Sequence, residues 1–383
     1  MSEGTAPAMI PITPGEITPR WLTAVLRSAG AIDRALVVRV EREMVGEDRG
    51  FTGAIARLRL SYDRPEPGAP ASLIAKMPLA ERTVASSLRE AQRLDPARLA
   101  RDHERSLREA RFYRAMGPEP EFAPRVYAIA DDIEAGRLVL LLEDLSAGRP
   151  GDALHNCAIA EARAVVAAIA RLHARWWERP ALDDFGWLPS WAPDPAAMAE
   201  RYRRNVGPVL ERYGERIPVY SRQLMLALPD HYEWVLATLN GPPATLIHAD
   251  LHLDNVIFRG PDDATEAVIL DWQTVSRGLG ALDLTSFVYG SLSIDDRRVA
   301  ELELMELYLA TLGEGGVLDY GIDELRYHER LALLWQLGGT VGWLARTTGT
   351  TPEGRERALI DAIFDPGRLF AALKDHDAAA LLG

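Results

Sequence analysis

The sequence from Leu246 to Asn255 reads Leu-Ile-His-Ala-Asp-Leu-His-Leu-Asp-Asn, and the segment from Val268 to Gln273 reads Val-Ile-Leu-Asp-Trp-Gln. The first segment has the pattern His-x-Asp-Leu-x-x-x-Asn, and the second is an aliphatic, strand-like run that ends in the carboxylate of Asp271. Mg²⁺ binds hard oxygen ligands, usually one or two carboxylates together with substrate phosphates. The side chains of Asn255 and Asp271 are therefore candidate metal ligands.

A simpler interpretation of these residues is a polar loop between two strands, with Asp250 and Asp254 capping a turn. Five positions, however, agree in order and spacing with the catalytic loop and metal-binding carboxylate of protein kinases: His248, Asp250, Leu251, Asn255 and Asp271. In that pattern the Asp accepts the proton of the substrate hydroxyl and the Asn binds Mg²⁺. The agreement of all five favours a kinase-like active site over a plain loop.

On these motifs the chain resembles the aminoglycoside phosphotransferase family of the protein-kinase-like fold, and within it the ecdysteroid-kinase-like (CHK-type) branch. The resemblance runs from about Val37 to about Phe287. It implies an α+β, bilobal fold with a small five-stranded antiparallel lobe that has one main helix, and a large, mostly helical lobe. We expect residues 1–142 to hold an N-terminal helix and the nucleotide-binding small lobe. Residues 143–383 would hold the hinge and the large lobe for catalysis and substrate binding.

The resemblance also implies roles for the motif residues. Asp250 would be the catalytic base, His248 would support the catalytic loop, and Asn255 and Asp271 would bind the metal. ATP and Mg²⁺ are the implied cofactors. The expected function is therefore a kinase that phosphorylates the hydroxyl of a small molecule, with a hydroxylated natural product as the candidate acceptor.

Composition agrees with a two-lobed enzyme. The 383 residues suffice for a large core, and the net charge of −13 argues against a nucleic-acid-binding or anionic-membrane surface. The single cysteine, Cys157, excludes an internal disulfide and fits a reducing compartment. No signal peptide is apparent, and no stretch approaches the roughly 18 uninterrupted apolar residues of a membrane span. We expect a cytoplasmic protein, and nothing in the sequence indicates a protein partner.

Lysine usage points to a nucleotide contact. Only two of the 43 basic residues are lysines, and Lys76 ends the apolar run Ser72-Leu-Ile-Ala-Lys. This run resembles the kinase strand whose lysine contacts the α- and β-phosphates. The alternative is a strand-end lysine that extends to water.

Glu109 shares the apolar face of a predicted helix, Leu99 to Met116. Such a glutamate needs a positive partner, which Lys76 would supply. An exposed helix edge is the alternative for Glu109.

The N-terminal third predicts the elements of the small lobe. A helical region is expected over 14–29, with Thr18-Pro19 as the cap and first turn. Five strands are predicted at 37–45, 54–62, 72–77, 124–130 and 137–142. The loop Gly46-Glu-Asp-Arg-Gly50-Phe51-Thr52-Gly53 joins the first two strands, and glycines allow close approach of backbone N–H groups to phosphates. A plain hairpin turn is equally compatible with the loop alone. Its place ahead of Lys76 favours phosphate contact by Gly50, Phe51 and Thr52.

The segment from Leu140 to Gly148 would connect the two lobes. By analogy with kinases, the Glu143 carbonyl and the Leu145 N–H would meet the edge of the adenine, with a register uncertain by one residue. A simple linker between lobes is compatible with the same sequence.

The remaining sequence predicts a helical large lobe. Helices are expected at 159–177, 232–239, 296–312 and 322–346, followed by a pair near the C-terminus. The stretch 189–229 is rich in Pro, Arg and Tyr. We interpret His173 as a satisfied core histidine, and Asp283 as an anchor of the catalytic loop that does no chemistry itself.

Departures from protein kinases narrow the substrate class. Ala249 stands where kinases carry an arginine after the histidine, and Trp-Gln follows Asp271 in place of Phe-Gly. No Ala-Pro-Glu sequence follows Asp271, so the chain has no segment after Asp271 that is long enough to order and hold a peptide substrate. We therefore expect a small-molecule acceptor.

Three alternatives remain at this point. A pseudokinase-type binding module would be expected to lack Lys76, Asp250, Asn255 or Asp271, and all four are present. A nucleotidyl-transferring relative with the same fold stays open, and so does an aminoglycoside-modifying resistance enzyme. The stretch 175–215 is the expected wall of the acceptor pocket, and its many aromatic residues favour a neutral hydroxylated natural product over a polycationic aminoglycoside. These aromatic residues are equally compatible with a place in the core of the lobe.

Overall fold

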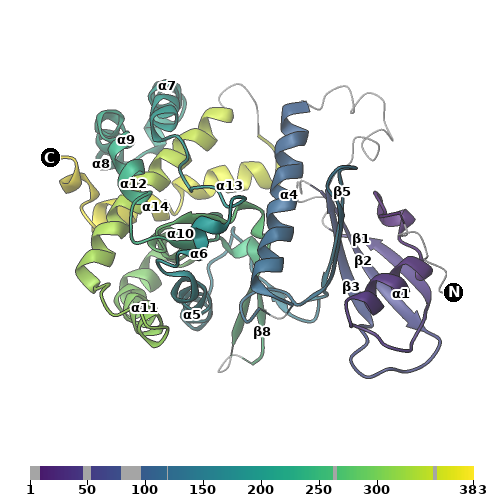
Figure 1. Cartoon of the computed structure of the whole chain (residues 1–383). Coiled ribbons are helices and arrows are strands. Elements are labelled where there is room, and N and C mark those ends of the chain that lie inside the picture. Colours follow the sequence, from purple (N-terminus) through teal and green to yellow (C-terminus); the bar gives the residue numbers. More distant parts are fainter. Residues whose placement is uncertain (1–8, 46–52, 79–95, 119, 262–264, 348–351) are drawn as a thin grey trace. The chain divides into compact units, whose positions relative to one another are not determined.

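The computed structural model describes residues 9–45, 53–78, 96–118, 120–261, 265–347 and 352–383. The chain forms two compact units (Figure 1). Unit 1 consists of Met1–Ala147 together with Asp271–Thr274, and unit 2 consists of Gly148–Leu270 and Val275–Gly383. The predicted division of function at residues 142 and 143 stays a prediction.

Unit 1 contains the five-stranded antiparallel sheet that the sequence predicts. Its strands are β1 (Val37–Met44), β2 (Gly53–Tyr62), β3 (Ser72–Pro78), β4 (Val126–Asp132) and β5 (Arg137–Glu143), in the order β1-β2-β3-β5-β4. Alternation along β2 explains its orientation, because Ala56, Leu58 and Leu60 are buried on one face.

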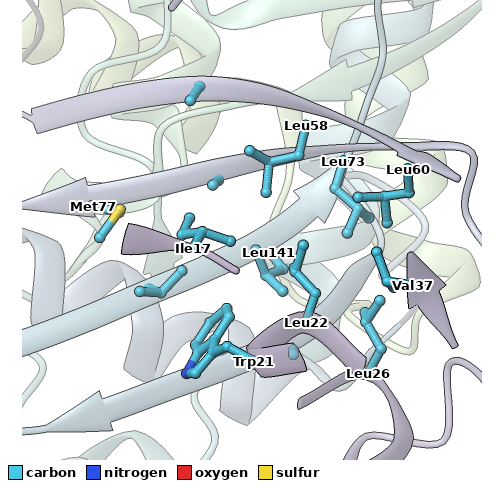
Figure 2. Packing of buried hydrophobic residues seen from close by; sticks show 14 of the residues in the cluster. Ile17, Trp21, Leu22, Leu26, Val37, Leu58, Leu60, Leu73, Met77 and Leu141 are labelled. Atoms are coloured by element: carbon cyan, nitrogen blue, oxygen red, sulfur yellow. The ribbon is translucent and has the colours of Figure 1, made fainter. Parts of the chain in front are cut away.

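The helix α1 (Pro19–Ser28) covers this apolar face (Figure 2). Thr18 caps it by accepting a hydrogen bond from the Trp21 N–H at 3.2 Å, and Pro19 occupies the first helical position. The helical region predicted over 14–29 is therefore divided, with a short 3₁₀ turn, η1 (Pro14–Glu16), before the cap. Trp21 and Leu22 of α1 pack against the buried strand residues.

The long helix α4 (Pro96–Met116) contacts the short 3₁₀ turn η7 (Trp272–Thr274). The Phe112 and Trp272 rings stack with their centroids 4.2 Å apart, and both side chains are fully buried. This contact incorporates the segment after Asp271 into unit 1, although it lies far away in the sequence.

Unit 2 is mostly helical. Its helices are α5 (Ile159–Trp176), α6 (Ala181–Asp184), α7 (Pro195–Tyr213), α8 (Val219–Ala227), α9 (Tyr232–Leu239), α10 (Ala281–Ser291), α11 (Ile294–Glu314), α12 (Ile322–Arg346), α13 (Gly354–Phe364) and α14 (Arg368–Asp375). The sequence pattern predicted no helix in the Pro-rich stretch that contains α7 and α8. Pro195 is compatible with α7 because it begins the helix, behind the Asp194 cap, whose carboxylate accepts a hydrogen bond from the Ala197 N–H at 2.9 Å. A second proline, Pro208, lies inside α7.

Short strands frame the catalytic loop within unit 2. β7 (Thr245–Ile247) pairs with β10 (Ser276–Gly278), while β6 (Arg149–Pro150), β8 (Val256–Arg259) and β9 (Glu266–Ile269) form a three-stranded sheet. The loop and the 3₁₀ turn η5 (Leu253–Asn255) therefore lie between β7 and β8. In the part of the chain that the structure describes, no helix is both long and apolar enough to cross a membrane.

Candidate active site

The catalytic loop is held at its start by Asp283 of α10. The two oxygens of this carboxylate accept hydrogen bonds from the backbone N–H groups of His248, at 2.6 Å, and Ala249, at 2.9 Å. Ala249 has a φ of 63°, in the left-handed region that residues with a side chain rarely occupy. Asp283 thus fixes a strained turn immediately before Asp250, as the predicted anchoring role requires.

Asp283 is itself buried, with 1% of its surface exposed, and His173 of α5 contacts it at 3.3 Å. His173 also bonds to the Tyr308 hydroxyl at 2.9 Å, which confirms the prediction of a satisfied core histidine. Burial alone would raise the pKa of Asp283, but the hydrogen bond and charge of His173, together with the hydrogen bond from the His248 backbone N–H, lower it below its ordinary value. The charge of Asp283 therefore stabilises the fold above that ordinary value, and this contribution is lost as the pH falls through the lowered value.

The His248 ring joins the loop to Leu270, the residue after β9. Its Nδ1 accepts a hydrogen bond from the Asp250 N–H at 3.2 Å, and its Nε2 lies 2.8 Å from the Leu270 carbonyl oxygen. These partners assign the tautomer that carries the proton on Nε2. Because His248 is fully buried and both ring nitrogens are engaged, the ring positions the loop.

Asp250 and Asn255 present the polar groups of the loop. The Asp250 side chain is 52% exposed, with His252 Nε2 at 3.9 Å from its carboxylate. The Asn255 amide nitrogen donates to the Asp250 carbonyl oxygen at 3.0 Å and lies 3.2 Å from His252 Nε2. With the amide nitrogen engaged, the amide oxygen of Asn255 is the atom suited to bind a cation.

Asp254, to which the sequence assigned no role, ties the loop to distant segments of unit 2. Its carboxylate accepts from the Ala153 N–H at 2.9 Å and from the Arg355 guanidinium at 2.8 Å and 2.9 Å. Arg355 also bonds to Asp152 at 2.9 Å. No local sequence signal could have identified this support, because Arg355 lies in the first turn of α13, far along the chain.

Within unit 1, Lys76 is the centre of a cluster of charges. Its ammonium nitrogen lies 2.7 Å from Glu109 Oε2 and 2.5 Å from Asp271 Oδ1. Asp271 Oδ2 accepts a hydrogen bond from the Gln273 side chain at 2.8 Å. The predicted ion pair between Lys76 and Glu109 is present, and the structure adds Asp271 to it.

The two carboxylates keep Lys76 charged. Glu109 is 1% exposed, so the pair lies largely out of water. Burial disfavours the charged ammonium, but the attraction of Glu109 and Asp271 outweighs it and raises the pKa of Lys76 above its ordinary value. Asp271 has a φ of 64°, which makes it the second strained residue of the motif. An ammonium fixed in this way is suited to contact phosphate oxygens.

The remaining predicted nucleotide contacts receive less support. Gly50, Phe51 and Thr52 lie outside the described residues. Glu143 ends β5 opposite Leu73, and its N–H donates to the Arg125 carbonyl oxygen at 2.9 Å. Leu145 follows in the half-buried linker. Contact of Glu143 and Leu145 with a nucleotide stays a prediction.

Asp144, which the sequence did not single out, fixes the linker to the sheet of unit 1. Its Oδ2 accepts hydrogen bonds from Arg57 Nε at 2.9 Å and from the Ser72 hydroxyl at 2.5 Å. Arg57 belongs to β2 and Ser72 to β3, so Asp144 joins both strands.

The donor chemistry of Asn255 and Asp271 fits Mg²⁺. Among the described residues, no group of three or more His, Cys, Asp or Glu side chains could hold a metal ion. Mg²⁺ is commonly bound through one or two carboxylates, with phosphate and water oxygens completing its coordination. The Asn255 amide oxygen and the Asp271 carboxylate are each of a donor type that Mg²⁺ binds, and their joint binding of a metal stays a prediction.

The antiparallel sheet, the Lys76 ion pairs and the supported catalytic loop define a protein of the kinase-like class. A family model described as "Phosphotransferase enzyme family" (APH) matches residues 90–326, more than half of the chain. The chain therefore belongs to the APH phosphotransferase family, a family of small-molecule kinases that use a nucleotide phosphate donor. The assignment to the ecdysteroid-kinase-like branch stays a prediction.

Two solved structures are similar to this chain at low sequence identity. Choline kinase from Cryptosporidium parvum Iowa II is 11% identical with a TM-score of 0.53, and the match covers 96% of this chain and 94% of that one. A putative aminoglycoside phosphotransferase from Ralstonia eutropha JMP134 is 15% identical with a TM-score of 0.49, covering 94% and 97%. The similarity to choline kinase confirms the predicted kinase-like fold. No curated protein matches the chain in sequence.

The Asp283 clamp predicts the effect of Asp283→Asn. The variant carboxamide has one acceptor oxygen, and its NH₂ group opposes the N–H of either His248 or Ala249. We expect the free energy of unfolding, measured in urea, to fall by about 1.5–3 kcal/mol. We also expect kcat to fall, because the strained turn before Asp250 is no longer held.

The matched control is Asp295→Asn in the first turn of α11, where the side chain is 96% exposed. It should change stability by less than about 0.5 kcal/mol. Wild-type stability and turnover in Asp283→Asn would contradict the clamp.

Proposed function

We propose that the protein transfers the γ-phosphoryl group of ATP, with Mg²⁺, to a hydroxyl group of a small molecule. The observation that supports this most strongly is the charge cluster of Lys76, Glu109 and Asp271. Burying or half-burying two carboxylates around one ammonium destabilises the fold, so we expect the lysine to have a function that requires a fixed charge. Phosphate binding is such a function, and it agrees with the family of the chain.

For the acceptor, we propose that Asp250 is the catalytic base. Its exposed carboxylate is free of buried ion pairs with arginine or lysine among the described residues, so it is available to a substrate hydroxyl. His248 binds its backbone N–H and positions it without touching the substrate. General base catalysis by a positioned carboxylate requires this combination of access and fixed backbone.

For the donor, we propose that Lys76 contacts the nucleotide phosphates and that Asn255 and Asp271 bind Mg²⁺. When bound, Mg²⁺ neutralises the negative charge that develops on the transferred phosphoryl group. Glu109 orients Lys76 at 2.7 Å. Gln273 holds the second oxygen of Asp271, which limits rotation of that carboxylate.

A small-molecule acceptor agrees with the chain after Asp271. In this segment the turn η7 packs against α4, and β10 and α10 follow directly, with α10 beginning at Ala281. These elements leave no segment of the kind that protein kinases use to hold a peptide. Ala249 also replaces the arginine that pairs with a phosphorylated activation loop.

The base assignment predicts the kinetics of Asp250→Asn. The variant retains the size of the side chain but cannot accept the proton of the hydroxyl. We expect kcat, measured as ADP release, to fall by about 10²-fold or more, with a small change in the ATP dissociation constant. Near-wild-type turnover would exclude Asp250 as the base. Asp184→Asn, at an exposed position in α6, is the control and should behave as the wild type.

The donor assignment predicts changes in nucleotide affinity. Asn255→Ala and Asp271→Ala should weaken Mg²⁺-dependent ATP binding, measured by calorimetry. Lys76→Ala should weaken it even at saturating Mg²⁺, and Lys76→Arg should not restore it, because the planar guanidinium is larger and shaped differently. Unchanged ATP dissociation constants in all three alanine variants would contradict the proposal. ADP as product, in place of AMP or pyrophosphate, separates phosphoryl transfer from nucleotidyl transfer.

A further inference from the structure

A cavity of about 550 Å³ lies among α7, α9 and α12 in unit 2. These three helices pack against one another (Figure 1). The described residues that line the cavity include three arginines and four aromatic residues: Arg201, Arg204, Arg346, Tyr202, Tyr232, Trp335 and Trp343. Its volume is in the range of small-molecule sites.

The charged residues among the described lining of the cavity are all positive. No aspartate or glutamate occurs among the described residues that line it. Arg201 and Arg204 lie one turn apart on α7, and no described carboxylate forms an ion pair with either of them or with Arg346. Arg203, which lies between them in the sequence, forms an ion pair with Glu200 at 3.5 Å. Three arginines around one cavity, without carboxylate partners among the described residues, are unexpected in a chain with a net charge of −13.

The shape of the cavity results from glycines on α12. A Cβ at Gly338 would overlap the Tyr232 hydroxyl, which donates to the Trp335 carbonyl oxygen at 3.3 Å. Gly338 therefore lets Tyr232 pack directly on the helix backbone. A Cβ at Gly339 or Gly342 would meet no described heavy atom within 4 Å, so these positions leave the space beside α12 open.

The cavity is linked to the catalytic loop through two tryptophans. The Trp335 ring, which lines the cavity, packs edge-to-face on Trp191 with centroids 5.0 Å apart. The Trp191 N–H donates to the Arg277 carbonyl oxygen of β10 at 2.8 Å. β10 pairs with β7, and the chain continues from β7 directly into His248. The wall of the cavity is therefore built on the strand pair that carries the catalytic loop.

We infer that this cavity binds the phosphoryl acceptor, and that the acceptor is a hydroxylated compound with a carboxylate or phosphate on a planar apolar body. The inference rests on the proposed kinase function. Guanidinium groups bind such anions through paired, charge-assisted hydrogen bonds, and the aromatic walls suit a planar body. This substrate class differs from the neutral acceptor expected from the sequence, and a polycationic aminoglycoside would meet three like charges.

A direct binding measurement tests whether the arginines of the cavity bind an anion. Calorimetry would compare naphthoate with its uncharged amide, naphthamide, in the presence of saturating MgADP so that the nucleotide site is filled. We expect naphthoate to bind the wild type more tightly than naphthamide. The triple variant Arg201→Gln, Arg204→Gln, Arg346→Gln should lose about tenfold or more in naphthoate affinity, with naphthamide little changed. Arg203→Gln, on the same helix, is the matched control and should retain wild-type affinity.

Filling the cavity provides a second variant that does not alter charge. Gly342→Leu places a side chain in the open space, so it should fold normally and block naphthoate binding. Gly207→Leu, at an exposed position on α7 where a Cβ also meets nothing within 4 Å, is its control. Equal naphthoate affinity in Gly342→Leu and Gly207→Leu would overturn the assignment of the cavity.

Steady-state kinetics tests whether the cavity binds the phosphoryl acceptor. ADP release would be measured on sets of anionic, neutral and cationic hydroxylated aromatic compounds. We expect the anionic set to have the highest kcat/KM, and the triple variant to raise KM for that set about tenfold with kcat little changed. Fastest turnover of the neutral or cationic set, or an unchanged KM in the triple variant, would overturn the inference and leave the kinase function intact. No ADP release on any set, with naphthoate still bound through the arginines, would instead count against the proposed function and remove the basis of the inference.

Discussion

The buried ion pair between Lys76 and Glu109 is the constraint on which the arrangement of unit 1 depends. A carboxylate that is 1% exposed is strongly destabilising unless a positive charge meets it. The strand β3 must therefore end beside α4, and the turn after Asp271 must approach the same ammonium. The stack of Phe112 on Trp272 brings that turn to α4. Apolar packing and charge pairing thus select the same geometry, in which we propose that Lys76 contacts phosphate.

In unit 2, buried contacts hold the exposed carboxylate of Asp250, the proposed catalytic base, in place. Asp250 follows a residue in the left-handed region, and such backbone strain persists only where the surrounding contacts fix it. Asp283 fixes the turn through two backbone N–H groups, and His173 holds Asp283. His248 then joins the loop to Leu270, the residue before Asp271. Asp250 is exposed, while the residues that position it are buried.

The sequence predicted the elements whose signals are local. Alternation predicted the strand β2, and the apolar face of α4 together with the resemblance to kinases paired Glu109 with Lys76. Contacts between distant side chains had no such signal. Asp144 holds Arg57 and Ser72, and the Asp254–Arg355 bond depends on the folded path of the whole unit. The helices α7 and α8 were not predicted because their stretch contains several prolines, although Pro195 begins α7 behind its cap and Pro218 precedes α8.

A double-mutant cycle on MgATP affinity tests most directly whether the Lys76–Glu109 pair exists to bind the nucleotide. Dissociation constants would be measured by calorimetry for the wild type, Lys76→Ala, Glu109→Gln and the double variant. If Glu109 acts by orienting the ammonium, Glu109→Gln weakens MgATP binding in the wild type and has little further effect once Lys76 is alanine. The expected coupling energy is about 1 kcal/mol or more. Equal effects of Glu109→Gln in both backgrounds would show that the two residues act independently, and would contradict the role assigned to the pair.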